Sequence, residues 1–208
     1  MLSTASQLPA LQKLIRRADS HKGLYGSVAV IGGNQGMLGA ALLAGRAALQ
    51  LGAGKVWLGL LDKQLQVDTS KPELMLCEAR KLLKQHTPTH CLIGPGLGQD
   101  RKAFKLIKQL LSSCIPLIID ADGLNLIARA PKLQQRLQQR DSETLITPHP
   151  SEAARLLDCE TQDIQAQRNV AIEQLTQKYN CHVILKGNQT LIASPTQRFQ
   201  NPTGNPAL

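Results

Sequence analysis

The stretch Ile146–Glu152 (ITPHPSE) places one histidine between two prolines at the end of an apolar run. Each proline fixes its own φ and keeps the residue before it out of the helical region, so we expect Thr147 and His149 to be extended. The imidazole of His149 would then project from the end of a strand, with Ser151 capping the helix that follows. These residues alone fit either a rigid strand-to-helix connector or a ligand-binding turn.

Glycine-rich turns follow two other predicted strands. Gly32–Gly39 (GGNQGMLG) lies between a strand at residues 27–31 and a helix that begins at Ala40, and Gly94–Gly98 (GPGLG) follows a strand at residues 90–93. Glycine lets backbone N–H groups approach an anion, and a helix N-terminus favours negative charge. The turns therefore fit phosphate binding, or tight packing alone. Their spacing matches neither the dinucleotide pattern GxGxxG nor a Walker A motif.

Charged side chains follow two further predicted strands. Asp120 and Asp122 come directly after a strand at residues 117–119, and Lys186 follows a strand at residues 182–185. We expect Asp122 to cap the next helix, whereas capping and metal binding both stay open for Asp120. Lys186 is either a cation beside bound phosphate or an ordinary exposed lysine.

Strands and helices alternate along the chain, which positions these turns. Helices are expected at residues 9–17, 40–49, 77–84, 101–111, 123–128, 131–140 and 161–179, and further strands at residues 55–61 and 191–193. Residues 63–76 are expected to be irregular. The pattern predicts a single α/β domain over residues 1–208, a mostly parallel sheet with helices on both faces. Ligands of such sheets bind outside the carboxyl ends of the strands, so the turns should meet at one crevice.

The composition limits the partners. Aromatic residues make up only 2% of the chain, so the core must be aliphatic and stacking platforms for nucleic-acid bases are missing. The net charge of +9 comes from basic residues that never run longer than a pair such as Arg16-Arg17. This pattern fits a solvated basic surface or an anionic small-molecule ligand, and predicts no nucleic-acid partner.

The cysteines and the N-terminal segment predict a cytoplasmic protein. The five cysteines are far apart, lack CxxC spacing and are expected to be reduced core residues. The N-terminal segment lacks the apolar centre of a signal peptide, and no apolar run is long enough to span a bilayer. We therefore expect no membrane partner.

Taken together, the turns resemble those of the ADP- or ATP-dependent NAD(P)H-hydrate dehydratases, a family with a ribokinase-like fold. The resemblance covers nearly the whole chain. It is carried by HKGLYG (21–26), VIGGNQGMLGAALLAGRAALQLGAGKV (30–56), PELM (72–75), IGPGLG (93–98), IIDADGLNLIA (118–128), LITPHPSEAARLL (145–157), VILKGNQTLIA (183–193) and NPTGNP (201–206).

The resemblance implies an activity and its site. Hydrated NADH or NADPH would be dehydrated back to the normal cofactor, with consumption of ADP or ATP and Mg²⁺, through a phosphorylated hydroxyl that is then eliminated. The residues implied to contact the hydrated dinucleotide are Ala40, Gly96, Gly98 and His149. Those implied to line the nucleotide phosphates are Lys186, Gly187, Asn188, Gln189 and Thr190.

Two departures from the family pattern matter. The family has KGAGT where this sequence has Lys186–Thr190 (KGNQT), so bulkier side chains stand near the nucleotide. The family also continues after NPTGNP into a GxGD motif, whose aspartate is the expected catalytic base. That aspartate would lie beyond Leu208, so we assign no catalytic residue within the sequence. We therefore expect a three-layer ribokinase-like fold without its C-terminal part, an exposed apolar sheet face, homo-oligomers, and little or no turnover by this chain alone.

Other functions stay open beside the dehydratase. A sugar or vitamin kinase would share the ribokinase-like scaffold, and fold alone does not separate the two. A non-catalytic nucleotide-binding protein would explain the missing aspartate. The TPHPSE and GPGLG turns favour the dehydratase, and a Rossmann dehydrogenase fits neither of them.

Overall fold

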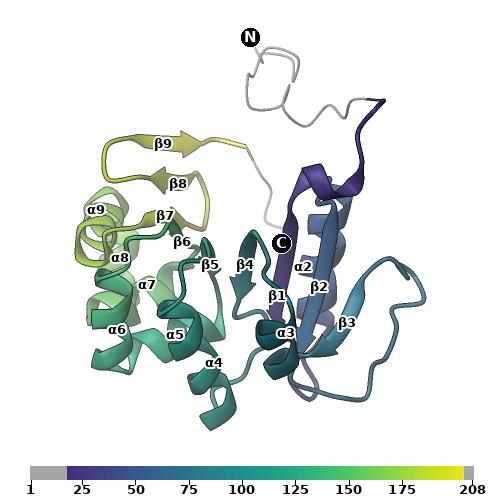
Figure 1. Cartoon of the computed structure of the whole chain (residues 1–208). Coiled ribbons are helices and arrows are strands. Elements are labelled where there is room, and N and C mark those ends of the chain that lie inside the picture. The colour runs from purple at the N-terminus through teal and green to yellow at the C-terminus, as the bar shows by residue number, and fades with distance from the viewer. Residues whose placement is uncertain (1–17, 204–208) are drawn as a thin grey trace.

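The structure, a computed structural model, describes residues 18–203. The helix predicted at residues 9–17 and the end of the chain at Leu208 lie outside the described residues. The described residues form one 9-stranded sheet in the order β3-β2-β1-β4-β5-β6-β7-β8-β9 (Figure 1). Strands β1 to β7 are parallel, β8 pairs antiparallel with β7, and β9 pairs antiparallel with β8. The strands are β1 (Ser27–Gly32), β2 (Lys55–Leu60), β3 (Met75–Glu78), β4 (His90–Ile93), β5 (Leu117–Ile119), β6 (Thr144–Ile146), β7 (His182–Leu185), β8 (Thr190–Ala193) and β9 (Arg198–Asn201).

Most of the described helices cover one face of the sheet. The other face carries α2 (Leu38–Gln50), which packs over β1 and β2. A short 3₁₀ helix, η2 (Lys22–Tyr25), precedes β1. The helices of the covered face are α3 (Ala79–Gln85), α4 (Arg101–Leu111), α5 (Asp122–Ala128), α6 (Pro131–Gln138), α7 (Pro150–Leu157), α8 (Thr161–Ala166) and α9 (Arg168–Tyr179).

Alternation along the strands divides the core in two. In β1, Ala29 and Ile31 point into the larger core under α3 to α9, and Val30 points into the smaller core under α2. The core is aliphatic as predicted, with Tyr179 as its fully buried aromatic residue. The tyrosine hydroxyl donates to the carbonyl oxygen of Leu156 at 2.9 Å, so its polar atom is satisfied.

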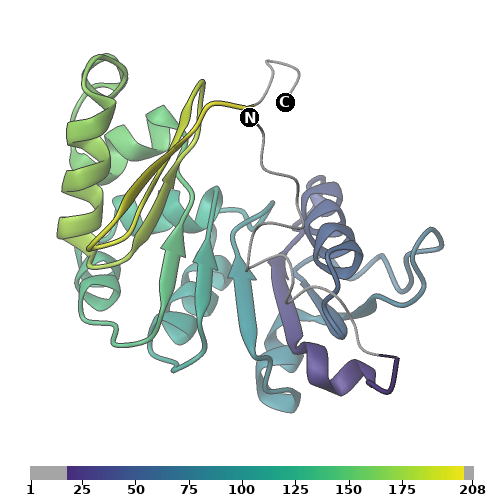
Figure 2. The same ribbon diagram turned by 90° about the horizontal axis from the view of Figure 1, so that it is seen from above.

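Among the described residues, no helix covers the α2 face of the sheet over β5 to β9 (Figure 2). Ile118 and Ile192 are 36% exposed there and Phe199 is 59% exposed, which confirms the predicted exposed apolar sheet face. Beside this face, α2 presents an outward apolar side chain, Leu43, which is 67% exposed. A contiguous apolar surface of this kind is unusual for a monomeric soluble protein.

Three predicted segments differ in the structure. Residues 63–76 are not wholly irregular, and the helix does not begin at Cys77: Met75–Glu78 pairs with β2 as an edge strand, and α3 begins at Ala79. Residues 161–179 are two helices, because the backbone leaves the helical region at Gln167 (φ −132°, ψ 52°). The sequence predicts no strand at residues 198–201, which pair as β9 with the free edge of β8.

The predictions about the cysteines are partly confirmed. The cysteines are free; Cys91 and Cys181 are buried as expected, but Cys114 and Cys159 are exposed, so the prediction of a core position is wrong for these two. Within residues 18–203, no helix combines the length and the apolar character that crossing a bilayer requires.

We predict that the bare sheet face drives self-association. The double substitution Ile192→Thr with Phe199→Gln removes apolar surface without opening a cavity, because both side chains are exposed. Light scattering should show smaller particles for this variant than for the parent, and a hydrophobic dye should fluoresce less with it. A parent chain that is a monodisperse monomer and does not raise the fluorescence of the dye contradicts the prediction.

Candidate functional site

The turns after the parallel strands are joined at the carboxyl edge of the sheet by backbone hydrogen bonds that continue the ladder. The first residue of a turn donates its N–H to a carbonyl oxygen at the end of the neighbouring strand or turn. The donor and acceptor residues are Gly94 and Ile31 at 3.1 Å, Asp120 and Ile93 at 3.1 Å, Thr147 and Ile119 at 3.2 Å, and Lys186 and Pro148 at 2.9 Å. The predicted meeting of these turns at one edge is therefore confirmed.

The GPGLG turn after β4 packs against the turn after β1. The N–H of Asn34 donates to the carbonyl oxygen of Gly96 at 2.6 Å. Gly96 has φ +60°, and a Cβ atom there would lie 2.5 Å from the carbonyl oxygen of Met37. Glycine is thus required for this close approach. Ala40 lies exposed in the first turn of α2, one turn beyond Met37, so it is on the same rim as Gly96.

Asp122 holds the GPGLG turn from the other side. Its carboxylate accepts from the N–H of Gly98 at 2.8 Å and from Nε2 of Gln99 at 3.1 Å. The prediction that Asp122 caps α5 is wrong: the N-cap is Ala121, with φ +47° and no side-chain cap hydrogen bond. The carboxylate instead accepts from Gly98 and Gln99, which the fold places beside it.

His149 is both extended and the N-cap of α7. Its φ of −81° and ψ of 168° confirm the extended prediction, but the cap is His149 and not Ser151. Nδ1 of His149 accepts from the N–H of Glu152 at 3.4 Å, and the Glu152 carboxylate accepts from the N–H of His149 at 2.9 Å. This reciprocal pair is a capping box. The imidazole is left 46% exposed, with Nε2 3.3 Å from Oε1 of Glu152.

A lysine crosses the edge from β7 to the end of β5. Nζ of Lys186 lies 2.7 Å from Oδ1 of Asp120 and 3.9 Å from Oε2 of Glu152. The side chain of Glu152 is only 5% exposed, so its charge depends on these partners. We call these three residues the Lys186 cluster. It places one flexible cation between the GPGLG turn and the β7–β8 hairpin, where it could bind a phosphate oxygen.

The hairpin that follows Lys186 is braced by an arginine. Arg168 donates to the carbonyl oxygens of Leu185 and Lys186, at 3.1 and 3.3 Å, and burial lowers its pKa. Gly187 has φ +135°, and a Cβ atom there would lie 2.9 Å from the guanidinium. Asn188 and Gln189 are exposed and line a hollow of about 420 Å³ together with Arg168.

The hydroxyl of Thr190 donates to the carbonyl oxygen of Gly187 at 2.9 Å, which closes the hairpin turn. Gln189 tolerates φ +53° at the position where the family has glycine. Within residues 18–203, no group of three or more His, Cys, Asp or Glu side chains is arranged to hold a metal ion.

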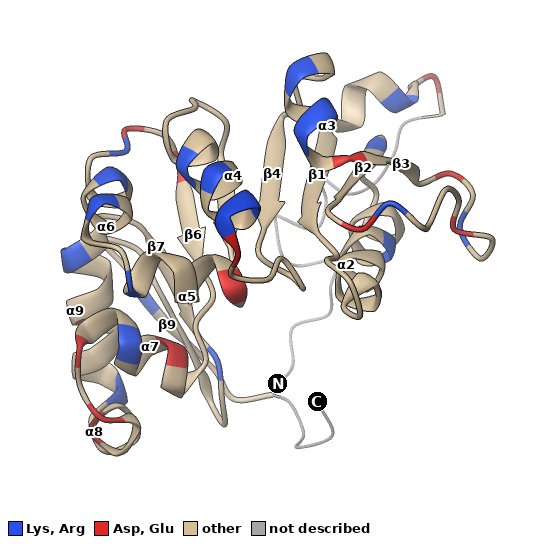
Figure 3. Ribbon diagram, turned by 90° about the horizontal axis from the view of Figure 1, so that it is seen from below, with Lys and Arg blue, Asp and Glu red and all other residues tan. Residues whose placement is uncertain are grey.

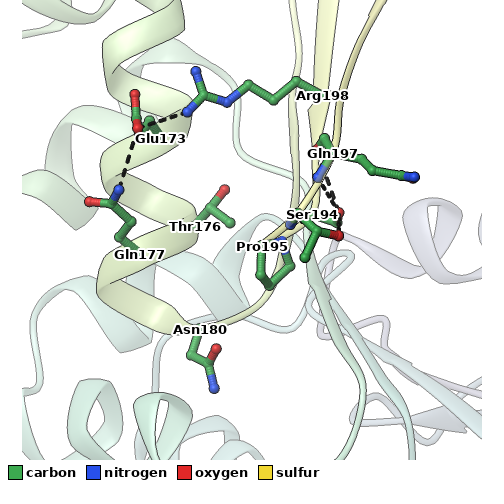
Figure 4. A pocket seen from close by; sticks show the side chains of 9 residues that line it. Glu173, Thr176, Gln177, Asn180, Ser194, Pro195, Gln197 and Arg198 are labelled. Carbon is green, nitrogen blue, oxygen red and sulfur yellow. Dashed lines mark hydrogen bonds and ion pairs between the residues drawn. The ribbon is translucent and has the colours of Figure 1, made fainter.

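Another hollow of about 420 Å³ lies at the opposite end of α9, between this helix and the β8–β9 turn (Figure 4). Arg198 and Glu173 form an ion pair of 2.8 Å in it. It contains none of the predicted site residues.

The fold thus gathers Ala40, Gly96, Gly98 and His149 with Lys186 along one edge, and places residues 187–190 at the end of that row. Sequence reasoning missed Glu152 and Arg168 as partners of the site. Glu152 could have been found, because a glutamate three residues after an N-cap is the capping-box pattern. No local pattern marks Arg168.

The catalytic aspartate stays a prediction. The family resemblance puts it beyond Leu208, and Leu208 itself lies outside the described residues, so the geometry of the crevice does not test it. No residue within the edge described above is assigned as the catalytic base.

We predict that Gly96→Ala disturbs the crevice more than Gly36→Ala does. Both glycines have positive φ, so both changes strain the backbone, but a Cβ at position 36 meets nothing within 4 Å. The added clash at position 96 should raise the total cost to about 2–4 kcal/mol, against about 1–2 kcal/mol at position 36. Chemical denaturation measures both, and equal losses would show that Gly96 is not required for the close approach.

Comparison with known proteins places the chain in a family. The family profile described as NAD(P)H-hydrate dehydratase matches residues 28–208. The ADP-dependent (S)-NAD(P)H-hydrate dehydratase of Neisseria meningitidis is 39% identical over 213 residues, which cover 100% of this chain and 71% of that relative. The bifunctional NAD(P)H-hydrate repair enzyme Nnr of Coxiella burnetii is 38% identical, and the match covers 100% of this chain but 42% of that relative.

Solved structures agree with the sequence relatives. The ADP/ATP-dependent NAD(P)H-hydrate dehydratase of Bacillus subtilis, co-crystallized with ATP/Mg²⁺, superposes with a TM-score of 0.77 at 30% identity, covering 92% of this chain and 69% of that one. A ribokinase-like superfamily protein of Enterococcus faecalis gives a TM-score of 0.76 at 27% identity, covering 92% and 68%. The fold is therefore ribokinase-like, and the chain belongs to the NAD(P)H-hydrate dehydratase family.

Proposed function

We propose that the carboxyl edge of the sheet binds hydrated NADH or NADPH together with ADP or ATP, for nucleotide-dependent dehydration of the hydrate. The observation that carries the proposal is the row of turns after β1, β4, β5, β6 and β7, which backbone hydrogen bonds join at one edge and in which Lys186 pairs with Asp120. The names of the relatives supply the chemistry. Because the chain spans 71% of one relative and 42% of another, the activity of the whole protein stays part of this proposal.

The hydrated dinucleotide would bind on the α2 side of the crevice. The N-cap of α2, Met37, makes no side-chain cap hydrogen bond, and the 13-residue helix directs its N-terminal dipole toward Ala40 and the GPGLG turn. Gly96 and Gly98 let the GPGLG turn lie close against Met37 and Asn34 at the start of α2. The exposed imidazole of His149 is placed to hydrogen-bond the dinucleotide. These residues bind and orient the substrate.

The nucleotide would bind on the hairpin side. Lys186 contributes a positive charge to its phosphates, and the turn at residues 187–190 contributes backbone N–H groups. Mg²⁺ is usually held by one or two carboxylates together with phosphate oxygens, and the carboxylate of Asp120, beside Lys186, fits that pattern. When bound, the ion would neutralise charge on the transferred phosphoryl group.

The chain's own residues would then act mainly by position. Phosphoryl transfer to the hydrate hydroxyl needs aligned reactants and nearby cations more than covalent protein chemistry. Departure of inorganic phosphate, with loss of a proton from the adjacent carbon, restores the double bond. The family resemblance assigns that proton to the aspartate of a GxGD motif, which residues 1–208 do not contain.

The kinase alternative has less support. A hydroxyethylthiazole kinase of Pyrococcus horikoshii shares the fold with a TM-score of 0.61, but its 13% identity shows the fold alone. A non-catalytic nucleotide-binding protein would bind ADP and ignore the hydrate, so one pair of titrations separates it from the dehydratase.

We predict that this chain binds both ligands, measured by calorimetry with ADP plus Mg²⁺ and with hydrated NADPH. Lys186→Met should weaken the binding of ADP by about tenfold or more, since hydrogen bonds to charged groups are worth about 1.5–3 kcal/mol. His149→Ala should weaken the binding of the hydrate more than it weakens the binding of ADP. Lys55→Met, at the amino end of β2, is the matched control and should change neither affinity. No binding of either ligand by the parent chain would refute the proposal.

Turnover is a separate measurement. For a polypeptide of residues 1–208 we expect restoration of NADPH at a small fraction of the rate of the Neisseria relative, because these residues include no GxGD motif. A rate near that of the relative would show that another group removes the proton.

We predict that Asp120→Asn reduces the magnesium dependence of ADP binding. Without the carboxylate, Lys186 loses its 2.7 Å partner and is freer to meet phosphate, so binding of ADP in EDTA should tighten. The gain in affinity that Mg²⁺ gives the parent chain should shrink, since a carboxylate for the ion is lost. Titrations with Mg²⁺ and with EDTA measure the two ADP affinities. If Mg²⁺ raises the ADP affinity of the variant as much as that of the parent chain, Asp120 does not belong to the magnesium site.

A further inference from the structure

Three helices of the covered sheet face carry only positive charge. The sequences of α3, α4 and α6 contain no aspartate or glutamate, and all of their lysines and arginines are exposed. Figure 3 shows these helices in a row, with α4 between α6 and α3. We call this surface the basic helix face. Its cations are Arg80, Lys81, Lys84, Arg101, Lys102, Lys105, Lys108, Lys132 and Arg136.

The three helices of the basic helix face lie over the same face of the sheet. α4 and α6 pack against each other, and Nη1 of Arg136 on α6 donates to the hydroxyl of Ser112 at the end of α4. Leu82 of α3 and Ile107 of α4 both belong to the larger core. Cations far apart in the sequence therefore lie on one surface.

The charge of this face is not compensated. Among the described residues, none of its cations forms an ion pair with a carboxylate, whereas ion pairs occur elsewhere, as between Arg46 and Asp68. The nearby acids are engaged: Asp100 caps α4, and Glu78 before α3 pairs with Lys63 at 3.4 Å. The face therefore creates a one-sided positive field.

Like charges also stand one helical turn apart on each helix. The i,i+4 pairs are Arg80 with Lys84, Arg101 with Lys105, and Lys132 with Arg136. Such pairs destabilise a helix, and a glutamate at either position would relieve the repulsion. A helical surface that keeps them on three elements is better explained by an anionic partner than by solubility alone.

The side chains on this face indicate which anion. Each of the described large apolar side chains that are exposed lies outside α3, α4 and α6, and Phe104 of α4 is half-buried. The face thus offers no wedge for a lipid layer and no aromatic anchor for a protein partner. Lys, Arg and Gln without aromatic platforms match contacts to phosphate groups, which position a nucleic acid without reading its bases.

We propose that the basic helix face binds the phosphate backbone of a nucleic acid without sequence preference. The proposal departs from the expectation drawn from the sequence, in which the basic residues looked scattered. It does not rest on the proposed dehydratase function, because the crevice lies at the carboxyl edge and this surface lies on the helices.

The test is fluorescence anisotropy with a labelled RNA hairpin and a labelled DNA duplex, each in two unrelated sequences. Binding by the parent chain should be micromolar, or about 10⁻⁶–10⁻⁴ M, near physiological salt and should weaken steeply as salt rises. The double variant Lys105→Glu with Lys108→Glu should bind about tenfold or more weakly, with a log–log salt slope reduced by about two. Preference for RNA or for DNA names the source of the phosphates.

The matched control is Lys55→Glu with Lys71→Glu, which makes the same change in net charge away from the face. It should keep its affinity within about threefold, since long-range attraction alone is screened at this salt. Circular dichroism melts of both variants show that each is folded. Equal losses in the two double variants, no binding by the parent chain, or tighter binding to phosphatidylserine vesicles would each overturn the proposal. So would displacement of the nucleic acid by ADP, which would place it in the crevice.

Discussion

The site depends on one geometric constraint, the continuation of the sheet's hydrogen bonding past the ends of its strands. Adjacent strands lie about 4.8 Å apart, so each added backbone bond fixes a turn at that distance from its neighbour. The N–H groups of Gly94, Asp120, Thr147 and Lys186 are used in this way. The backbone alone therefore sets the spacing of the turns, and the side chains on them need only the correct direction.

Electrostatics then joins the two halves of the edge. Glu152 is nearly buried, and an unpaired carboxylate there would be costly. It is satisfied by the N–H of His149 and by the nearby ammonium of Lys186, which also meets Asp120. His149 and Lys186, which are proposed to meet the substrate and the nucleotide respectively, thus share one carboxylate. A phosphate that binds Lys186 must compete with Asp120 and Glu152 for the ammonium. The same two carboxylates therefore position the cation and reduce its attraction for a phosphate.

Several predictions from the sequence succeeded because their cause is local, although the local prediction of Ser151 as the cap of α7 was wrong. Proline on both sides of His149 fixes an extended backbone, and glycine at position 96 marks a close approach. Others failed where a distant partner decides. Asp122 has a local reason to cap α5, but the fold brings the N–H of Gly98 to it from 24 residues away. In the described part of the chain, the edge strand β3 pairs with β2 alone. Neither its length nor its residue pattern indicates a strand.

The separation of edge from face explains how the family resemblance survives sequence change. Contacts made by backbone N–H groups and glycines are insensitive to most substitutions, so Asn188 and Gln189 can replace smaller residues while the hairpin keeps its form. The surfaces are under no such constraint. One sheet face is apolar over β5 to β9, and the opposite face carries the basic helix face on α3, α4 and α6. The geometry of the edge therefore follows from its backbone, whereas the character of each face follows from its side chains.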